Sequence, residues 1–318
     1  MGKYIIKRLL MAIPVFLIMT FALFMLSNMM PGSAIDVIMM ESELSPEARA
    51  ALEHQMGLDK PVVVRYVLWL RDMLSGNMGV SVVTKNTVAS MIAVRLGPTL
   101  MLTLTGIGLA ILISIPLGVF SAYRPYSAID NVSSFLAFIG SSAPSFFISL
   151  SAVYIFAVKL KLLPAQGMYT AGAAVTFSDR LRHLILPAMV IAFQSMGNLV
   201  KQTRGSVLEV LGEDYIKTAR SKGIREELVI LRHALRNALI PIVTTISLSL
   251  PFVIGGSVVV ETIFSWPGLG SLMITSITNR DYPPIMGVAV VICIVVLVFN
   301  ILLDIIYSLL DPRISYEK

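Results

Sequence analysis

The sequence predicts an all-α polytopic membrane protein with six transmembrane helices. Of the 318 residues, 56% are hydrophobic and only 14% are charged, whereas soluble domains carry about 25% charged residues. The chain also contains six stretches without Asp, Glu, Lys or Arg, which are 27, 28, 28, 18, 24 and 22 residues long. These stretches are Leu9–Ile35, Leu96–Tyr123, Asn131–Val158, His183–Val200, Asn237–Val260 and Tyr282–Leu303.

Each apolar stretch predicts one membrane-spanning helix. A helix needs about 20 residues to cross the hydrocarbon core, so five stretches are long enough and the fourth is at the lower limit. Lipid offers no hydrogen-bond partner to backbone amides, and the stretches must therefore be helical. This composition excludes soluble enzymes, nucleic-acid-binding proteins and domains held by disulfides. The single cysteine, Cys293, lies in the sixth stretch and is expected to be a small buried residue.

The first span is expected to remain attached to the mature chain. Lys3, Lys7 and Arg8 precede it, as basic residues precede a signal peptide. A cleavable apolar region has about 7–15 residues, however, and this one is longer. We assign residues 1–35 to a cytoplasmic tail and the first transmembrane helix.

Basic residues predict the orientation of the spans. Short segments rich in Lys and Arg stay in the cytoplasm, and six spans leave both termini on one side. The N-terminal tail and the connection between spans four and five are both basic, so we place both in the cytoplasm. The connection carries Lys201, Arg204, Lys217, Arg220, Lys222, Arg225, Arg232 and Arg236. Four basic residues near the 159–182 connection would lie outside, against this trend.

Residues 36–95 predict a small helical extracellular insertion between the first two spans. Ser45 is suited to cap a helix that begins at Pro46. Val62 to Leu74 is amphipathic and carries Trp69, for which anchoring at the membrane interface is the simplest role. Residues 96–318 then hold spans two to six, with a cytoplasmic loop at 201–241.

The 201–241 loop predicts a short helix from Glu213 to Lys222. Gly212 interrupts the preceding helix, and Gly223 is suited to a left-handed cap after it. Glu213 and Asp214 favour the positive end of the helix dipole, and Lys217 lies four residues after Glu213 at ion-pair spacing. The stripe Ile224, Leu228, Leu231 and Leu235 predicts packing of the next segment under the bundle.

Two interpretations of this short helix remain open from the residues alone. A rigid helix on the cytoplasmic surface suits a protein that receives force from a cytoplasmic partner. An amphipathic helix held by anionic lipid explains the same pattern.

The residues of this loop resemble a known family. Residues 213–223 (Glu-Asp-Tyr-Ile-Lys-Thr-Ala-Arg-Ser-Lys-Gly) and 233–241 (His-Ala-Leu-Arg-Asn-Ala-Leu-Ile-Pro) closely resemble the coupling loop of dipeptide/oligopeptide ABC-importer permeases. The resemblance extends over nearly the whole chain. It includes 57–61 (Gly-Leu-Asp-Lys-Pro), 76–81 (Gly-Asn-Met-Gly-Val-Ser), 142–147 (Ser-Ala-Pro-Ser-Phe-Phe), 183–188 (His-Leu-Ile-Leu-Pro-Ala), 261–270 (Glu-Thr-Ile-Phe-Ser-Trp-Pro-Gly-Leu-Gly) and 280–283 (Arg-Asp-Tyr-Pro).

The loop departs from the wider ABC-importer pattern at two places. The Glu-Ala-Ala triplet of that pattern falls on Lys217-Thr218-Ala219, and the proline expected near Arg236 stands at Pro241. Both departures are usual in the peptide subfamily. They leave open which side chain makes the main contact with an ATPase.

The resemblance implies the type I ABC importer permease fold and a set of partners. These are a second homologous permease in a heterodimer, two cytoplasmic ATPase subunits, an extracellular or periplasmic substrate-binding protein and membrane lipid, in a bacterial or archaeal cell membrane. The cargo implied is a di- or oligopeptide, with nickel, glutathione or oligosaccharides as alternatives. The implied ATPase-coupling residues are Glu213, Asp214, Tyr215, Ala219, Arg220, Lys222 and Gly223. Ala219 is implied as a small residue that permits close approach to a groove, with packing inside this chain as its alternative.

The sequence offers no chemistry of its own to drive transport. The only Gly-Lys pair is Gly2-Lys3, so a phosphate-binding GxxxxGK[ST] loop is absent. The three histidines lack metal-ligand spacing. We therefore expect no catalytic residue, cofactor or metal here, with ATP and Mg bound by partner subunits. A secondary carrier or membrane-embedded enzyme would need ionisable or nucleophilic groups within the spans. Asp304 comes nearest, and pairing with a basic loop residue is its favoured role.

Small hydroxylic side chains are the candidates for lining the translocation path. They are Ser141, Ser142, Ser145, Thr244, Thr245, Ser247 and Ser249, although helix packing explains such residues equally well. A path without fixed charges should bind cargo weakly. Residues 261–279 predict an extracellular turn and short helix, with Trp266 and Asp281 as candidates at the mouth.

Overall fold

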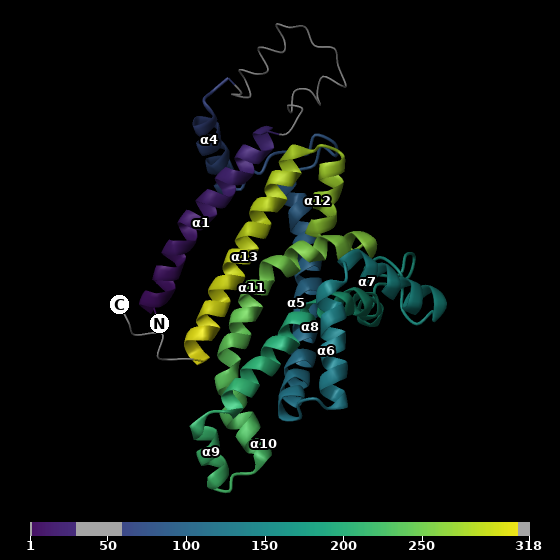
Figure 1. The fold of residues 1–318 in the computed structure, drawn as a ribbon. Coiled ribbons are helices and arrows are strands. Elements are labelled where there is room, and N and C mark those ends of the chain that lie inside the picture. The colour runs from purple at the N-terminus through teal and green to yellow at the C-terminus, as the bar shows by residue number, and fades with distance from the viewer. Residues whose placement is uncertain (1, 30–58, 311–318) are drawn as a thin grey trace.

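The named secondary-structure elements are all helices in the computed structural model, which describes residues 2–29 and 59–310 (Figure 1). In chain order they are α1 (Gly2–Met29), α4 (Val62–Leu74), α5 (Val88–Tyr123), α6 (Ala128–Ser142), α7 (Ser145–Ala152), the π-helix η1 (Val153–Lys159), α8 (Phe177–Leu211), α9 (Asp214–Ser221), α10 (Glu226–Leu228), the π-helix η2 (Val229–Ala234), α11 (Leu235–Ile263), α12 (Leu269–Thr278) and α13 (Tyr282–Leu310). The predicted helix start at Ser45 and Pro46 lies outside the described residues.

Within the described residues, five helical segments are long and apolar enough to cross a membrane, and a bent pair supplies a sixth candidate. The bend of 112° separates α6 from α7 and η1. The third predicted span, 131–158, falls on this bent pair. Pro144 cannot continue the helix of α6, and it drives Ala143 into extended backbone with ψ 136°.

The centre of the bundle is built on α8, which packs along α5, α6 and α11. Small residues allow the helix axes to approach. A side chain at Gly118 would meet Thr203, and one at Gly197 would meet the backbone carbonyl of Ala137. Such close contacts replace the hydrophobic effect as the source of helix association inside lipid.

The first and last spans, α1 and α13, lie side by side at one edge of the bundle (Figure 1). Arg8 and Asp304 form an ion pair of 3.2 Å between them. Asp304 thus has the basic partner that was expected, although the partner comes from α1 and not from a loop.

The predicted amphipathic helix in the insertion is confirmed as α4. Its Tyr66 is buried, and the Tyr66 hydroxyl lies 3.0 Å from Thr20 Oγ1 of α1. Trp69 packs against the ring of Phe24 with ring centroids 5.5 Å apart. Aromatic packing therefore fastens the described part of the insertion to the first span.

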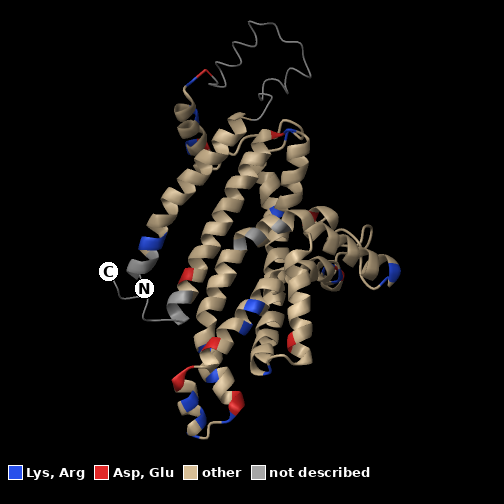
Figure 2. Cartoon of the chain, viewed as in Figure 1, with Lys and Arg blue, Asp and Glu red and all other residues tan. Residues whose placement is uncertain are grey.

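Charged side chains are concentrated on the short helices at one end of the bundle. Acidic and basic side chains gather on α9 and α10 at the lower end of Figure 2, whereas the middle of the bundle is largely uncharged. The amino end of α1 and the carboxyl end of α13 are directed toward the same end as α9 (Figure 1).

Candidate functional site

The short helix of the 201–241 loop is present as α9, Asp214–Ser221, with Glu213 at its N-cap. The N–H of Gly212 bonds to the carbonyl of Glu209, where α8 ends. Gly223 has φ +74°, the left-handed conformation that favours glycine. The predicted helix and its glycine cap are therefore confirmed, and the ends differ from prediction by one residue.

The inner face of α9 packs against the segment that follows it. Ile216 and Ala219 are buried with Val229 and Ala234 in one apolar cluster. The side chain of Ala219 therefore packs within the loop, which fits the alternative given for it, and its approach to a groove on another protein stays a prediction.

The predicted apolar stripe after α9 is wrong at two positions. Leu228 and Leu231 are 50% and 61% exposed, whereas Val229 and Ala234 are fully buried. The cause is the π-helix η2, because its wider turn places residues five apart on the same face. The three- and four-residue spacing of an ordinary α-helix therefore predicted the wrong buried face for this segment.

The outer face of α9 consists of exposed polar residues. They are Glu213, Asp214, Tyr215, Lys217, Arg220 and Lys222, followed by the exposed Gly223. The Lys217 ammonium lies 2.8 Å from Asp214 Oδ1, so its ion-pair partner is Asp214 and not the predicted Glu213. The Tyr215 hydroxyl accepts a hydrogen bond of 3.0 Å from the Asn237 amide.

Arg220 holds α9 to the start of α10. Its guanidinium donates to both carboxylate oxygens of Glu226, at 2.6 and 3.1 Å. These hydrogen bonds raise the pKa of Arg220 above its usual value. A two-point contact fixes the orientation of the guanidinium as well as its charge. Arg220 thus has a carboxylate partner in its own chain, and its implied contact with an ATPase stays a prediction.

A polar cavity of about 320 Å³ lies at the bend between α6 and α7. Three of the predicted path residues line it, namely Ser141, Ser145 and Ser249. The rest of its lining is Gly140, Ala143, Ile191, Gln194, Ser195, Asn198 and Val253.

The other four predicted path residues are not in this lining. Thr244 and Thr245 donate hydrogen bonds to carbonyls one turn earlier in α11. These bonds fit the helix-packing alternative, since they satisfy the hydroxyl within its own helix. Ser142 and Ser247 are outside the lining as well.

The amides of Gln194 and Asn198 were missed in the sequence. They are four residues apart in the charge-free stretch of span four, so they lie on one face of α8. Two carboxamides at that spacing in a membrane-spanning helix could have indicated a polar cavity, because an unpartnered amide that faces lipid is costly.

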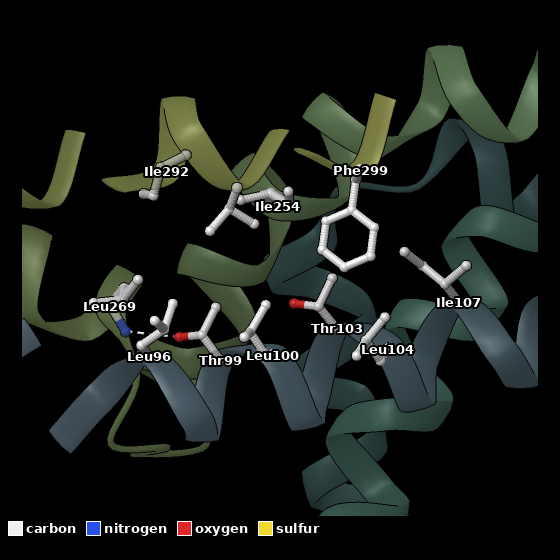
Figure 3. A pocket seen from close by; sticks show the side chains of 11 residues that line it. Leu96, Thr99, Leu100, Thr103, Leu104, Ile107, Ile254, Leu269, Ile292 and Phe299 are labelled. Carbon is white, nitrogen blue, oxygen red and sulfur yellow. Dashed lines mark hydrogen bonds between the residues drawn. The ribbon is translucent and has the colours of Figure 1, made fainter. Parts of the chain in front are cut away.

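A second pocket, of about 10 Å³, is enclosed by apolar side chains of α5, α11 and α13 (Figure 3). Thr99 on its wall accepts a hydrogen bond of 2.7 Å from the backbone N–H of Leu269. This pocket is too small for a cargo molecule, and Thr99 has a structural role in it.

Thr99 belongs to a buried network around Glu261. The Thr99 hydroxyl donates to Glu261 Oε1 at 2.7 Å, and the N–H of Ser271 donates to Oε2 at 3.1 Å. A side chain at Gly268 would collide with the Glu261 carboxylate, so the turn needs glycine there. The predicted turn and short helix after Glu261 are confirmed by α12, Leu269–Thr278.

The two residues predicted at the extracellular mouth are buried. Trp266 is fully buried, and its indole N–H donates to the carbonyl of Pro98 at 3.0 Å. Asp281 is 3% exposed and accepts hydrogen bonds from the Ser81 hydroxyl and the N–H of Val82. Both side chains fasten segments of this chain to each other, and their place at an extracellular mouth stays a prediction.

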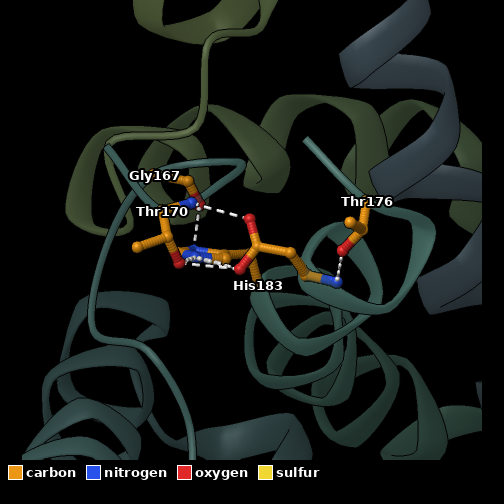
Figure 4. Close-up of polar contacts among 5 residues, drawn as sticks. Gly167, Thr170, Thr176 and His183 are labelled. Atoms are coloured by element: carbon orange, nitrogen blue, oxygen red, sulfur yellow. Dashed lines mark hydrogen bonds and ion pairs between the residues drawn. The ribbon is translucent and has the colours of Figure 1, made fainter. Parts of the chain in front are cut away.

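Polar contacts also hold the 160–176 connection on the start of α8 (Figure 4). Asp179 accepts hydrogen bonds from the N–H and the hydroxyl of Thr170, at 2.8 and 2.7 Å. His183 is buried and its Nδ1 lies 3.1 Å from the carbonyl of Gly167. Across the described residues, no group of three His, Cys, Asp or Glu side chains is placed to hold a metal ion.

A buried ion pair joins α6 to α8 near the lower end of the bundle. Arg204 Nε and Nη2 donate to the two carboxylate oxygens of Asp130, at 2.7 and 2.9 Å, and Asp130 is 3% exposed. The N–H of Tyr126 donates to the same carboxylate at 2.9 Å.

Removing only the acid of this pair should be more damaging than removing both charges. In D130A the Arg204 guanidinium would lie half-buried without its counter-charge, for an expected loss of about 3 kcal/mol of stability. The double variant D130A/R204M should recover at least half of that loss. Thermal unfolding of the purified chain in detergent measures both, and equal losses in the two variants would contradict the pairing.

Comparisons with known proteins agree with this architecture. The family described as "Binding-protein-dependent transport system inner membrane component" matches residues 114–316, and the N-terminal component of the same family matches residues 1–103. The chain is 44% identical to the oligopeptide transport system permease protein AppB of Bacillus subtilis, over 99% of this chain and 100% of that one. It is 34% identical to the dipeptide transport system permease protein DppB of Escherichia coli K12, over the full length of both.

A solved structure supports the fold. The MetNI methionine ABC transporter in an inward-facing conformation aligns with a TM-score of 0.56 at 17% identity, over 70% of this chain and 96% of that chain. With two matches that together account for most of its length and with full-length relatives, the chain belongs to the binding-protein-dependent transport system inner membrane components, the permease subunits of ABC importers.

Proposed function

We propose that this permease translocates di- and oligopeptides delivered by an extracellular substrate-binding protein. The observation that carries the proposal is the full-length similarity to permeases named for oligopeptide and dipeptide transport, at 44% and 34% identity. The polar cavity supports it, because amides and hydroxyls can bond to the repeated N–H and C=O groups of any peptide without regard to its side chains.

The energy for this transport would enter through α9. In this proposal, two ATPase subunits bind ATP and Mg, and one of them receives the exposed face formed by Glu213, Asp214, Tyr215, Lys222 and Gly223. The cluster of Ile216 and Ala219 with η2 makes the helix a rigid part of the bundle. A push on α9 would therefore reach α11, into which η2 leads directly. A second, homologous permease would complete the path.

The proposed orientation places α9 and both termini in the cytoplasm of a bacterial or archaeal cell. The basic residues of the N-terminal tail and of the 201–241 loop support it. The amino end of α1 and the carboxyl end of α13 both lie toward α9. This arrangement agrees with six crossings, which leave both termini on one side of the membrane.

Reconstitution of the complete complex tests the proposed function. Vesicles that contain both permeases and the ATPases should take up a labelled dipeptide or pentapeptide only with ATP and the loaded binding protein. A complex with a hydrolysis-deficient ATPase is the matched control. ATP-driven uptake of nickel, glutathione or an oligosaccharide without peptide uptake would replace the cargo assignment. Uptake by this chain without any ATPase would indicate a secondary carrier and overturn the proposal.

A further inference from the structure

A polar stripe on α8 runs beyond the cavity. Gln194, Asn198 and Lys201 follow each other at intervals of four and three residues, so they share one face of the helix. Gln194 and Asn198 line the cavity. Lys201 lies about 4.5 Å farther along the helix axis, toward α9. The stripe thus ends in a positive charge on the side of the cavity nearer the coupling helix.

Lys201 also contacts the opposite wall. Its ammonium lies 3.4 Å from the Ser141 hydroxyl of α6, which lines the cavity, and 5.7 Å from the centre of the Phe138 ring. The hydroxyl and the ring face hold the ammonium between α6 and α8 without neutralising it. A lysine side chain is flexible enough to leave these weak contacts for a stronger one.

The charge of Lys201 has no carboxylate to balance it in the part of the chain that the structure describes. No ion pair within 4.0 Å involves Lys201 there, whereas Arg204, one turn later, is paired with Asp130. The Lys201 side chain is exposed, so an anion can reach it, and an unbalanced cation beside a polar cavity attracts anions. The lining of the cavity itself carries no charged side chain, and Lys201 lies next to that lining.

We propose that Lys201 is a specificity-determining residue that binds the carboxylate of a peptide cargo as the cargo moves from the cavity toward the α9 end. The inference rests on the proposed peptide transport. Gln194, Asn198 and the serines would hold the peptide backbone, and the ammonium would favour the end or side chain that carries a negative charge. Contact with one ammonium is charge-assisted but solvated, so it selects without trapping.

The test compares two forms of one peptide in the reconstituted complex. Uptake of trialanine with a free carboxylate is divided by uptake of trialanine amide, each loaded on saturating binding protein. Delivery is the same for every permease variant, so a change in this ratio reports the permease alone. In K201Q the ratio should fall about threefold to tenfold, as expected for loss of one partly solvated ionic hydrogen bond. K201R should retain the ratio, because it keeps the charge.

Two controls separate this role from its alternatives. K159Q removes one exposed positive charge outside the cavity and should leave the ratio unchanged. The measurement is repeated in phosphatidylcholine vesicles with and without phosphatidylglycerol. An effect of K201Q seen only with the anionic lipid would assign Lys201 to a lipid phosphate and overturn the inference.

Equal ratios in wild type and K201Q would also overturn it, while leaving the proposed function intact. Failure of the wild-type complex to take up either peptide would instead remove the proposed function, and the inference with it.

Discussion

Replacing Gly223 with leucine should abolish ATP-driven uptake while the protein still inserts in the membrane. Gly223 has φ +74°, and an L-residue in this conformation costs about 1 kcal/mol, too little to unfold the bundle. Among the residues that the structure describes, and apart from its two chain neighbours, no heavy atom lies within 4 Å of the position a Cβ would take, so the larger side chain has room in the isolated permease. A loss of transport would then arise at the surface offered to an ATPase.

Gly172 provides the matched control for Gly223. It has φ +78° and an equally open surrounding, but it lies in the 160–176 connection on the other side of the bundle. G172L and G223L should lower the melting temperature by similar small amounts, because both introduce the same backbone strain. Only G223L should lose stimulation of the ATPases by loaded binding protein. Wild-type uptake by G223L would remove α9 as the coupling element.

Replacing Glu261 with alanine should destabilise the protein by about 3 kcal/mol, because the buried donors that Glu261 satisfies would lose their acceptor. These donors are the Thr99 hydroxyl and the N–H of Ser271. E261Q keeps one acceptor oxygen and should lose about half as much. The measurement is thermal unfolding in detergent, followed by tryptophan fluorescence, to which Trp266, buried beside this network, contributes together with Trp69. A melting temperature unchanged in E261A would show that the network contributes nothing.

A second substitution tests the geometry of the same network. In G268A the new methyl group would collide with the Glu261 carboxylate, so this variant should also be destabilised. The collision is absent when Glu261 is alanine, and the double variant E261A/G268A should therefore lose less than the sum of the two single losses. G205A is the control, since Gly205 lies in α8 with open space around it, where alanine favours the helix. Additive losses would contradict the close contact.

The short helix α9 illustrates how far local sequence signals reach. Glycines on both sides and acids in the first turn define α9 within one residue, because capping and backbone conformation depend on a few adjacent residues. Local signals did not predict which face of the segment after α9 is buried. That face depends on whether the backbone forms an α- or a π-turn, and the π-helix η2 leaves Leu228 and Leu231 exposed.

The path residues show the same division. Hydroxyl groups in a span mark helix packing and cavities alike, so composition did not separate Ser141 and Ser249 from Thr244. The bend at Pro144 opens the cavity and thereby selects which of them line it. Trp266 and Asp281 lie in the turns before and after α12. Only their long-range contacts with Pro98 and Ser81 show that both side chains are buried and hold segments of the chain together.

The sequence by itself determined that the chain crosses a membrane in helices, where the spans lie, and that a capped short helix stands between the fourth and fifth spans. These features follow from lipid, which satisfies no backbone group, and from residues adjacent in the chain. The tertiary structure decided which faces are buried, which side chains surround the cavity, and that the charge of Lys201 is unbalanced while that of Arg204 is paired. Such features depend on distances between residues far apart in sequence, and those distances are set only when the helices pack.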